Sequence, residues 1–271
     1  MNKKIIFKQD AKEILNNSSF YYNNVLDLSS LDLVEEIADF AFSASKKTIE
    51  KVILPINLKK IGQSSFMYNQ IKKYNQIKKI VWNDKIEHLS FACFENNKIQ
   101  DLVIPNSLKS IEESSFAMNL IKKLEIPETL THLETDTFFA NAIEDLEIHH
   151  FNNKILKQAF SSNENIKNIK LISDFKFFQN KAEIPFKSLV FYFLDHFSDY
   201  ENEVELEINN ENITIFLKSL EIENIQKIIL ENSKSDSDEV FDFYVEKINT
   251  EFGLEFKLIS KKRWKSNLKI L

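Results

Sequence analysis

Glycine and cysteine are scarce in this chain of 271 residues, which has two glycines, Gly62 and Gly253, and one cysteine, Cys93. Two isolated glycines cannot form a phosphate-binding loop, a dinucleotide-binding fingerprint or a nucleophile elbow, because each motif needs glycines at close spacing. One cysteine excludes an internal disulfide framework. No apolar run approaches the roughly 18 residues of a membrane helix. We therefore expect no cofactor and no membrane partner.

We expect that the start of the sequence is not an export signal. Its first seven residues are basic and then apolar, as in a signal peptide, but charged residues interrupt the apolar stretch before it reaches the usual length of about 7 to 15 residues. The interrupting residues are Lys8, Asp10, Lys12 and Glu13. We expect a cytoplasmic protein.

Charge is unevenly distributed. Residues 1–172 carry 22 basic and 22 acidic residues, whereas residues 173–271 carry 13 basic and 19 acidic ones. The second region therefore accounts for the whole net charge of −6. A nucleic-acid-binding protein needs a basic surface, so we expect no nucleic acid among the partners.

Phenylalanine is abundant and regularly spaced. Seven phenylalanines stand 22, 24, 28, 22, 22 and 22 residues apart: Phe20, Phe42, Phe66, Phe94, Phe116, Phe138 and Phe160. A fixed period of this size is typical of stacked-repeat folds. The sequence therefore predicts a solenoid.

Three other positions recur in register with the phenylalanines. The position five before is aliphatic: Leu15, Ile37, Ile61, Leu89, Ile111, Leu133 and Ile155. The position just before is small: Ser19, Ala41, Ser65, Cys93, Ser115, Thr137 and Ala159. The third position after is mostly asparagine: Asn23, Ser45, Asn69, Asn97, Asn119, Asn141 and Asn163. Bulky and small rows together fill an interior, and short amides bond the backbone at turns.

Each repeat ends in a short stretch of alternating residues, as in 52–54, 102–104, 124–126 and 146–148, which predicts one strand per repeat. A proline follows three of these stretches and ends the strand: Pro55, Pro105 and Pro127. We expect the strands to form one parallel sheet on a face of the solenoid.

The repeat phrase resembles that of the BspA-like (Treponema-type) leucine-rich repeat family, and it is clearest from Ile111 through Phe116 and Asn119 to Pro127. The resemblance covers residues 10–172. It implies a curved right-handed coil used for contacts between proteins, and for surface adhesion in several members. The predicted fold is α/β, with a leucine-rich-repeat solenoid of about seven repeats of ~22 residues over 1–172. Its first repeat acts as an N-terminal cap.

One repeat is longer than the others because residues 68–73 are duplicated letter for letter as 74–79. The added residues are expected to loop out at the turn. Such a loop is either a contact site or a tolerated insertion.

Regular spacing stops near residue 172. Beyond it, the pattern predicts helices at 187–200, 211–220 and 237–252 and strands at 203–208, 227–230 and 254–259. This alternation favours a small α/β domain over 173–271, which would cover the last coil of the solenoid.

We find no convincing catalytic or metal site in the sequence. His88 and His132 occupy the same repeat position two coils apart, which places them roughly 10 Å from each other, too far for one ion. The pair His149 and His150 follows a strand end and is typical of loop residues. Acidic residues between 195 and 207 follow the outer face of a strand, the basic run 261–265 is short, and Cys93 lies in the small packing row.

The outward residues of the predicted strands are the remaining candidates. One row reads Asp27, Lys51, Lys79, Asp101, Lys123, Asp145 and Asn168, and its neighbour reads Ser29, Ile53, Val81, Val103, Glu125, Glu147 and Lys170. Three apolar residues in succession on a face that meets water are typical of a contact surface, although β-propensity and ion pairing also explain such rows. We predict a partner-binding face of Ile53, Lys79, Val81, Asp101, Val103, Lys123, Glu125, Asp145 and Glu147.

The sequence thus favours a non-catalytic protein that binds a protein partner and is a monomer or weak oligomer. Two alternatives remain open. One is an immunity- or antitoxin-type inhibitor that acts through the acidic C-terminal region, and the other is a surface adhesin.

Overall fold

A computed structural model describes residues 4–43, 47–67, 76–149 and 158–173. Farther along the chain it describes Ile225 and the residues 177–179, 182–184, 204–206, 227–232, 240–250 and 253–260. The chain divides into two compact units. Unit 1 comprises Met1–Asp145 and Asn153–Asn165, and unit 2 comprises Leu146–Asn152 and Ile166–Leu271.

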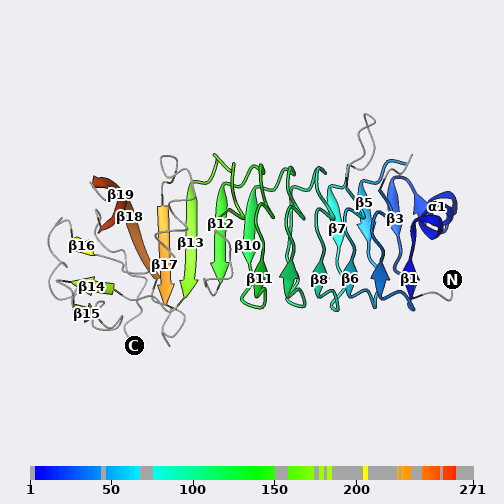
Figure 1. Cartoon of the computed structure of the whole chain (residues 1–271), viewed down its shortest axis with the longest axis horizontal. Coiled ribbons are helices and arrows are strands. Elements are labelled where there is room, and N and C mark those ends of the chain that lie inside the picture. The colour runs from blue at the N-terminus through cyan, green and yellow to red at the C-terminus, as the bar shows by residue number, and fades with distance from the viewer. Residues whose placement is uncertain are drawn as a thin grey trace, which may run out of the picture. The chain divides into compact units, whose positions relative to one another are not determined.

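Unit 1 is a solenoid built on two sheets rather than the single sheet predicted. Sheet A is parallel and consists of β1 (Ile5–Ile6), β4 (Glu36–Ile37), β6 (Lys60–Ile61), β8 (His88–Leu89), β9 (Ser110–Ile111) and β11 (His132–Leu133). These strands lie side by side along unit 1 (Figure 1). From β4 on, each strand contains the aliphatic residue five positions before a phenylalanine. The sequence did not predict these strands because two residues are too few to show a period of two.

Sheet B contains β2 (Tyr21–Tyr22), β3 (Val25–Asp27), β5 (Lys51–Ile53) and β7 (Lys79–Val81). β2 is antiparallel to β3, and the other pairs are parallel. The predicted strand at 102–104 is wrong, because that repeat has only an isolated bridge between Asp101 and Lys123. The following repeat forms β10 (Lys123–Ile126), as expected.

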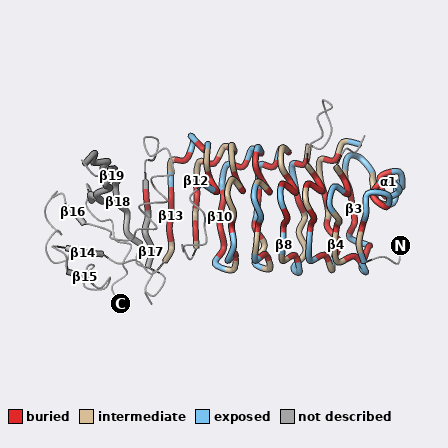
Figure 2. Tube along the Cα trace, in the orientation of Figure 1, coloured by how far each residue is buried: buried red, intermediate tan, exposed pale blue. Residues whose placement is uncertain are grey.

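The phenylalanine ladder forms the core of unit 1. Adjacent rings from Phe42 to Phe160 stack with centroids 5.1 to 5.7 Å apart and interplanar angles of 2 to 7°. All six side chains are fully buried, and buried residues recur along every coil (Figure 2). The ladder therefore has six members instead of seven. Phe20 is only half-buried and stands before β2.

The segment before Phe20 forms a helix, whereas the corresponding segments of later repeats contain a strand of sheet A. α1 spans Lys8–Asn16, and Asp10, Ala11, Ile14 and Leu15 form its buried side. The Asp10 carboxylate accepts a hydrogen bond from the Phe7 N–H at 2.9 Å, which satisfies a backbone donor at the helix start.

The predicted asparagine ladder is confirmed from Asn97 to Asn163. Asn119 shows the pattern: its Nδ2 donates to the carbonyls of Phe94 and Phe116 at 3.0 and 3.1 Å, and its Oδ1 accepts from the Ile99 N–H at 3.1 Å. Each of these asparagines therefore ties its own turn to the preceding repeat. Asn23 does not belong to the ladder, because it is exposed in a left-handed turn with φ 47°.

The small row is also buried as predicted, from Ala41 to Ala159. Its hydroxyls find backbone partners: Ser115 Oγ donates to the carbonyls of Ser90 and Glu112 at 3.0 and 2.7 Å. Gly62 is needed for a close approach, because a Cβ there would lie 2.7 Å from the Asp39 nitrogen.

The described part of unit 2 consists of strands. These are β12 (Asp145–His149, beginning at the last residue of the first stretch of unit 1), β13 (Asn168–Ser173), β14 (Phe177–Gln179), β15 (Ala182–Ile184), β16 (Val204–Leu206), β17 (Lys227–Asn232), β18 (Val240–Thr250) and β19 (Gly253–Ser260). β13 and β17 pair in parallel, whereas β17, β18, β19 and β16 pair antiparallel in that order, and β14 pairs with β15.

Three predicted strands of the C-terminal region are confirmed as β16, β17 and β19. The helix predicted over 237–252 is wrong, because β18 occupies residues 240–250 of that range and pairs on both sides. Its many β-branched and aromatic residues favour a strand. The helices predicted at 187–200 and 211–220 lie outside the described residues, as does most of the duplicated segment 68–79.

Candidate functional site

Inward and outward residues alternate as the sequence predicted. Val52, Ile80, Leu102 and Leu124 are buried. The residues on either side of them point outward and range from half-buried to exposed. In unit 1 the outward set is Ile53, Lys79, Val81, Asp101, Val103, Lys123, Glu125 and Asp145, which we call the Val103 face.

The register between β3 and β5 shows that the first residue of each predicted row, Asp27 and Ser29, was misplaced. Asp27 lies opposite Ile53 rather than opposite Lys51, whose partner in β3 is Val25. Ser29 lies beyond the end of β3. In the next pair Ile53 lies opposite Val81, as predicted.

Val103 is the most exposed apolar residue of the face. It is 75% exposed, whereas Ile53 and Val81 are half-buried. The repeat that carries Val103 stays in contact with the preceding one, since the Lys98 N–H donates to the Ile77 carbonyl at 2.9 Å. An aliphatic side chain is thus held in water on a defined backbone, which is typical of an interaction surface.

Charges at the far end of the predicted site are neutralised within the protein. Lys123 Nζ lies 3.6 Å from Asp145 Oδ2. Glu147 belongs to unit 2, where its Oε1 lies 2.9 Å from Lys170 Nζ and 2.9 Å from His149 Nε2. Partner binding by these residues stays a prediction.

At the near end, the positive charge of Lys51 acts on the carboxylate of Asp27. Burial alone would raise the pKa of Asp27. Hydrogen bonds from Ser29 and Tyr22, together with the charge of Lys51, outweigh that effect and lower the pKa. The Ser29 hydroxyl donates to the carboxylate at 2.6 Å. Lys79 is exposed, and no ion pair joins it to an acidic residue in the part of the chain that the structure describes.

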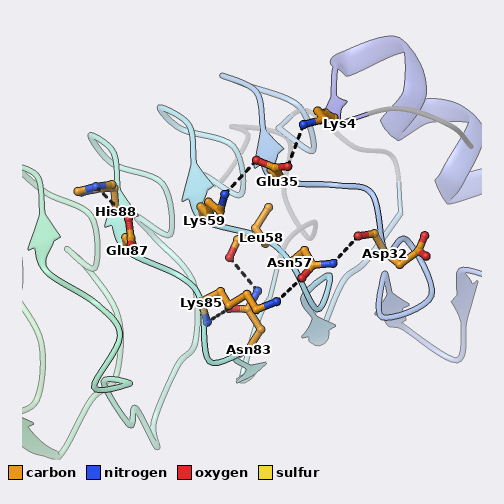
Figure 3. A network of polar contacts seen from close by, with 10 residues as sticks. All are labelled: Lys4, Asp32, Glu35, Asn57, Leu58, Lys59, Asn83, Lys85, Glu87 and His88. Carbon is orange, nitrogen blue, oxygen red and sulfur yellow. Dashed lines mark hydrogen bonds and ion pairs between the residues drawn. The ribbon is translucent and has the colours of Figure 1, made fainter.

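The outer face of sheet A is different, because its charges alternate and pair. Glu35 accepts from both Lys4 and Lys59 at 3.1 Å, and these two hydrogen bonds lower the pKa of its carboxyl group (Figure 3). Lys60 and Lys109 pair with Glu36 and Glu87 at 3.4 and 3.2 Å. Such a surface already satisfies its own charges.

Sequence reasoning missed a polar network at one corner of the solenoid. Asn83 donates to the Leu58 carbonyl at 2.9 Å, and its Oδ1 accepts from the Lys85 N–H at 2.9 Å (Figure 3). Asn83 also donates to the Pro55 carbonyl and accepts from the Ile86 N–H at 2.8 Å. Asn57 extends the network by donating to the Asp32 carbonyl (Figure 3). The signal in the sequence was an asparagine just after a strand.

The histidines of unit 1 are placed as the spacing implied. His88 and His132 are both register partners of Ser110, which lies between them, and His88 Nδ1 is 2.7 Å from the Ser110 hydroxyl. Within the described residues, no group of three or more His, Cys, Asp and Glu side chains is arranged to hold a metal ion.

Cys93 is completely buried, and burial raises the pKa of its thiol far above the usual range. The thiol is therefore a packing group, as predicted, because nucleophilic chemistry requires the thiolate. No helix that the structure describes is long and apolar enough to cross a membrane.

Comparisons with known proteins bear on the repeats. A sequence profile described as the BspA type leucine-rich repeat region matches six copies over residues 12–86 and 69–189. Among solved structures, the chain is similar to a leucine-rich repeat protein from Bacteroides ovatus ATCC 8483, with 18% identity and a TM-score of 0.29. That similarity covers 55% of this chain and 56% of the other, so the chain spans just over half of its length. No curated protein matches the chain.

Proposed function

Because the chain belongs to the BspA-type leucine-rich repeat family, with six repeat copies between residues 12 and 189, we propose that it is a non-catalytic module that binds a protein partner on its Val103 face. The observation that carries the proposal is the 75% exposure of Val103 between the half-buried Val81 and the charged strand β10. Burial of such a side chain by a partner contributes about 25 cal/mol for each Å² of apolar area.

Electrostatics favour this face over sheet A. The charges of sheet A pair with one another at 3.1 to 3.4 Å, so a partner would have to compete with existing ion pairs. The Val103 face instead combines apolar side chains with Lys79, which forms no ion pair with any described residue. Buried apolar anchors supply most of the affinity of an interface, and charges around them select the partner.

Two alternative functions predict different outcomes. An inhibitor acting through the acidic residues 173–271 would bind its target whatever the residue at position 103. A surface adhesin would act outside the cell, and the cytoplasmic location stays a prediction.

The proposal is tested by Val103→Asp. Affinity purification on the immobilised full chain, with quantitative mass spectrometry, identifies a partner, which is then purified and titrated against each variant. We expect Val103→Asp to weaken binding by about tenfold or more, because it places a charge in an apolar contact. Since Val103 is exposed, the variant should keep the wild-type thermal midpoint.

Leu120→Asp is the matched control, because Leu120 is 41% exposed in the same unit but lies outside the Val103 face. Its affinity should equal that of the wild type. A partner that binds the Val103→Asp variant as tightly as the wild type would refute the proposed face.

A further inference from the structure

A lysine of the Val103 face, Lys79, lies beside a second lysine, Lys51, that borders the face. Lys51 and Lys79 are direct partners in the parallel pair of β5 and β7, so their backbones are about 4.8 Å apart. Like charges directly opposite one another destabilise a sheet. An anionic group bound between them would remove that repulsion.

Within the described residues, the charge of Lys51 is balanced only in part, and no acidic residue pairs with Lys79. The Lys51 charge acts on Asp27, but that carboxylate is also held by the Ser29 hydroxyl and N–H at 2.6 and 3.0 Å. Lys79 is exposed and has no ion pair within the described residues. By contrast, Lys123 on the same face already pairs with Asp145. Lys79 is therefore the cation most available to a partner.

Apolar residues lie next to this cation. Val81 follows Lys79 on the same side of β7, because residues two apart on a strand share a face. Val103 occupies the equivalent position in the next repeat and is 75% exposed. A cation and two aliphatic side chains of two neighbouring repeats thus follow one another on the same face.

We infer that Lys79, together with Lys51, binds a carboxylate of the partner protein. Val81 and Val103 contact an apolar side chain of the partner, which lies near the acidic residue in the partner's sequence. The inference rests on the proposed function and adds the chemistry of the partner, an acidic residue close to an apolar one. The partner's carboxylate would lie on the β5 side of Lys79, because β5 carries Lys51 and β7 carries Lys79.

A polyanion such as nucleic acid does not fit the same surface. Asp101 and Glu125 follow in the next two repeats and would repel an extended chain of phosphates. The whole chain has a net charge of −6. A single carboxylate between Lys51 and Lys79 would lie on the side of Lys79 that faces away from Asp101.

A displayed library of random 12-residue peptides, selected on the immobilised full chain, tests the inference. We expect selected peptides to be enriched in Asp or Glu near Leu, Ile, Val or Phe. Fluorescence polarisation of a selected peptide should show binding about tenfold weaker to Lys79→Glu and nearly unchanged binding to Lys79→Arg. A peptide in which Lys replaces the acid should regain affinity for Lys79→Glu.

Lys12→Glu is the control, because Lys12 is exposed on α1 and the substitution changes the net charge equally. Peptides that lose affinity for Val103→Asp but not for Lys79→Glu would overturn the carboxylate inference and leave the proposed function standing. Peptides that bind both variants like the wild type, or a selection that yields no binder, would count against both. Displacement of the peptide by an oligonucleotide would show a polyanion site and would also overturn the inference.

Discussion

At the scale of single residues, the solenoid depends on polar side chains that satisfy its turns. The backbone adopts positive φ at two recurring positions, two before and two after the phenylalanine, and residues other than glycine occupy them, such as Phe40 and Met118 at 56°. A left-handed conformation costs about 1–2 kcal/mol for a residue with a Cβ. The asparagines beside these turns offset the cost through their hydrogen bonds.

We predict that Asn119→Ala destabilises the protein by about 2–4 kcal/mol. The substitution leaves the buried N–H of Ile99 without its partner and removes the bonds to the carbonyls of Phe94 and Phe116. Urea denaturation followed by circular dichroism measures the change. Asn106→Ala is the control, because Asn106 is exposed, and its midpoint should stay within error of the wild type. Equal midpoints for the two variants would show that the ladder contributes nothing.

At the scale of elements, the six stacked phenylalanine rings hold the coils together. The sequence spacing instead predicts a ladder of seven, which also includes Phe20, and mutagenesis separates the two. Phe116→Ala should cost about 3–5 kcal/mol, because the ring is fully buried between Phe94 and Phe138. Phe20→Ala should cost about 1 kcal/mol, because Phe20 is half-buried and outside the stack. Thermal unfolding of both variants separates the two. If the two variants lost similar amounts of stability, Phe20 would belong to the ladder after all.

Recurrence explains which elements were predictable from the sequence. The phenylalanine, small and asparagine rows repeat at a fixed period, so their burial and bonding follow from packing alone. Sheet A was missed because its strands from Glu36–Ile37 to His132–Leu133 have two residues each. The break at Leu102–Ile104 was missed because its sequence alternates like a true strand. The local sequence does not distinguish an alternating segment that pairs with a neighbouring strand from an alternating segment that does not.

The Val103 face shows the same division between what sequence could and could not reveal. Its inward and outward residues followed from the alternation. The exposure of Val103, and the lack of an ion pair between Lys79 and any described acidic residue, depend on neighbouring repeats. Asp27 was placed in the wrong row because β3 follows the antiparallel strand β2 rather than an ordinary repeat. The number of residues between paired positions therefore differs here, and Asp27 lies opposite Ile53.

At the scale of the whole molecule, the described part of the chain combines a solenoid with a second unit made of strands. In the sequence, charge separates along the chain, with a neutral region up to residue 172 and an acidic one after it. A neutral solenoid does not steer partners by long-range attraction, so recognition on it depends on local contacts. This favours a small apolar and charged patch as the recognition element.

Hydrogen–deuterium exchange of the full chain, with and without the purified partner, tests the central claim most directly. The account predicts that partner binding slows exchange in β7 (Lys79–Val81) and in residues 101–104, and leaves β9 (Ser110–Ile111) of sheet A unchanged. Protection confined to sheet A or to residues 173–271 would contradict it.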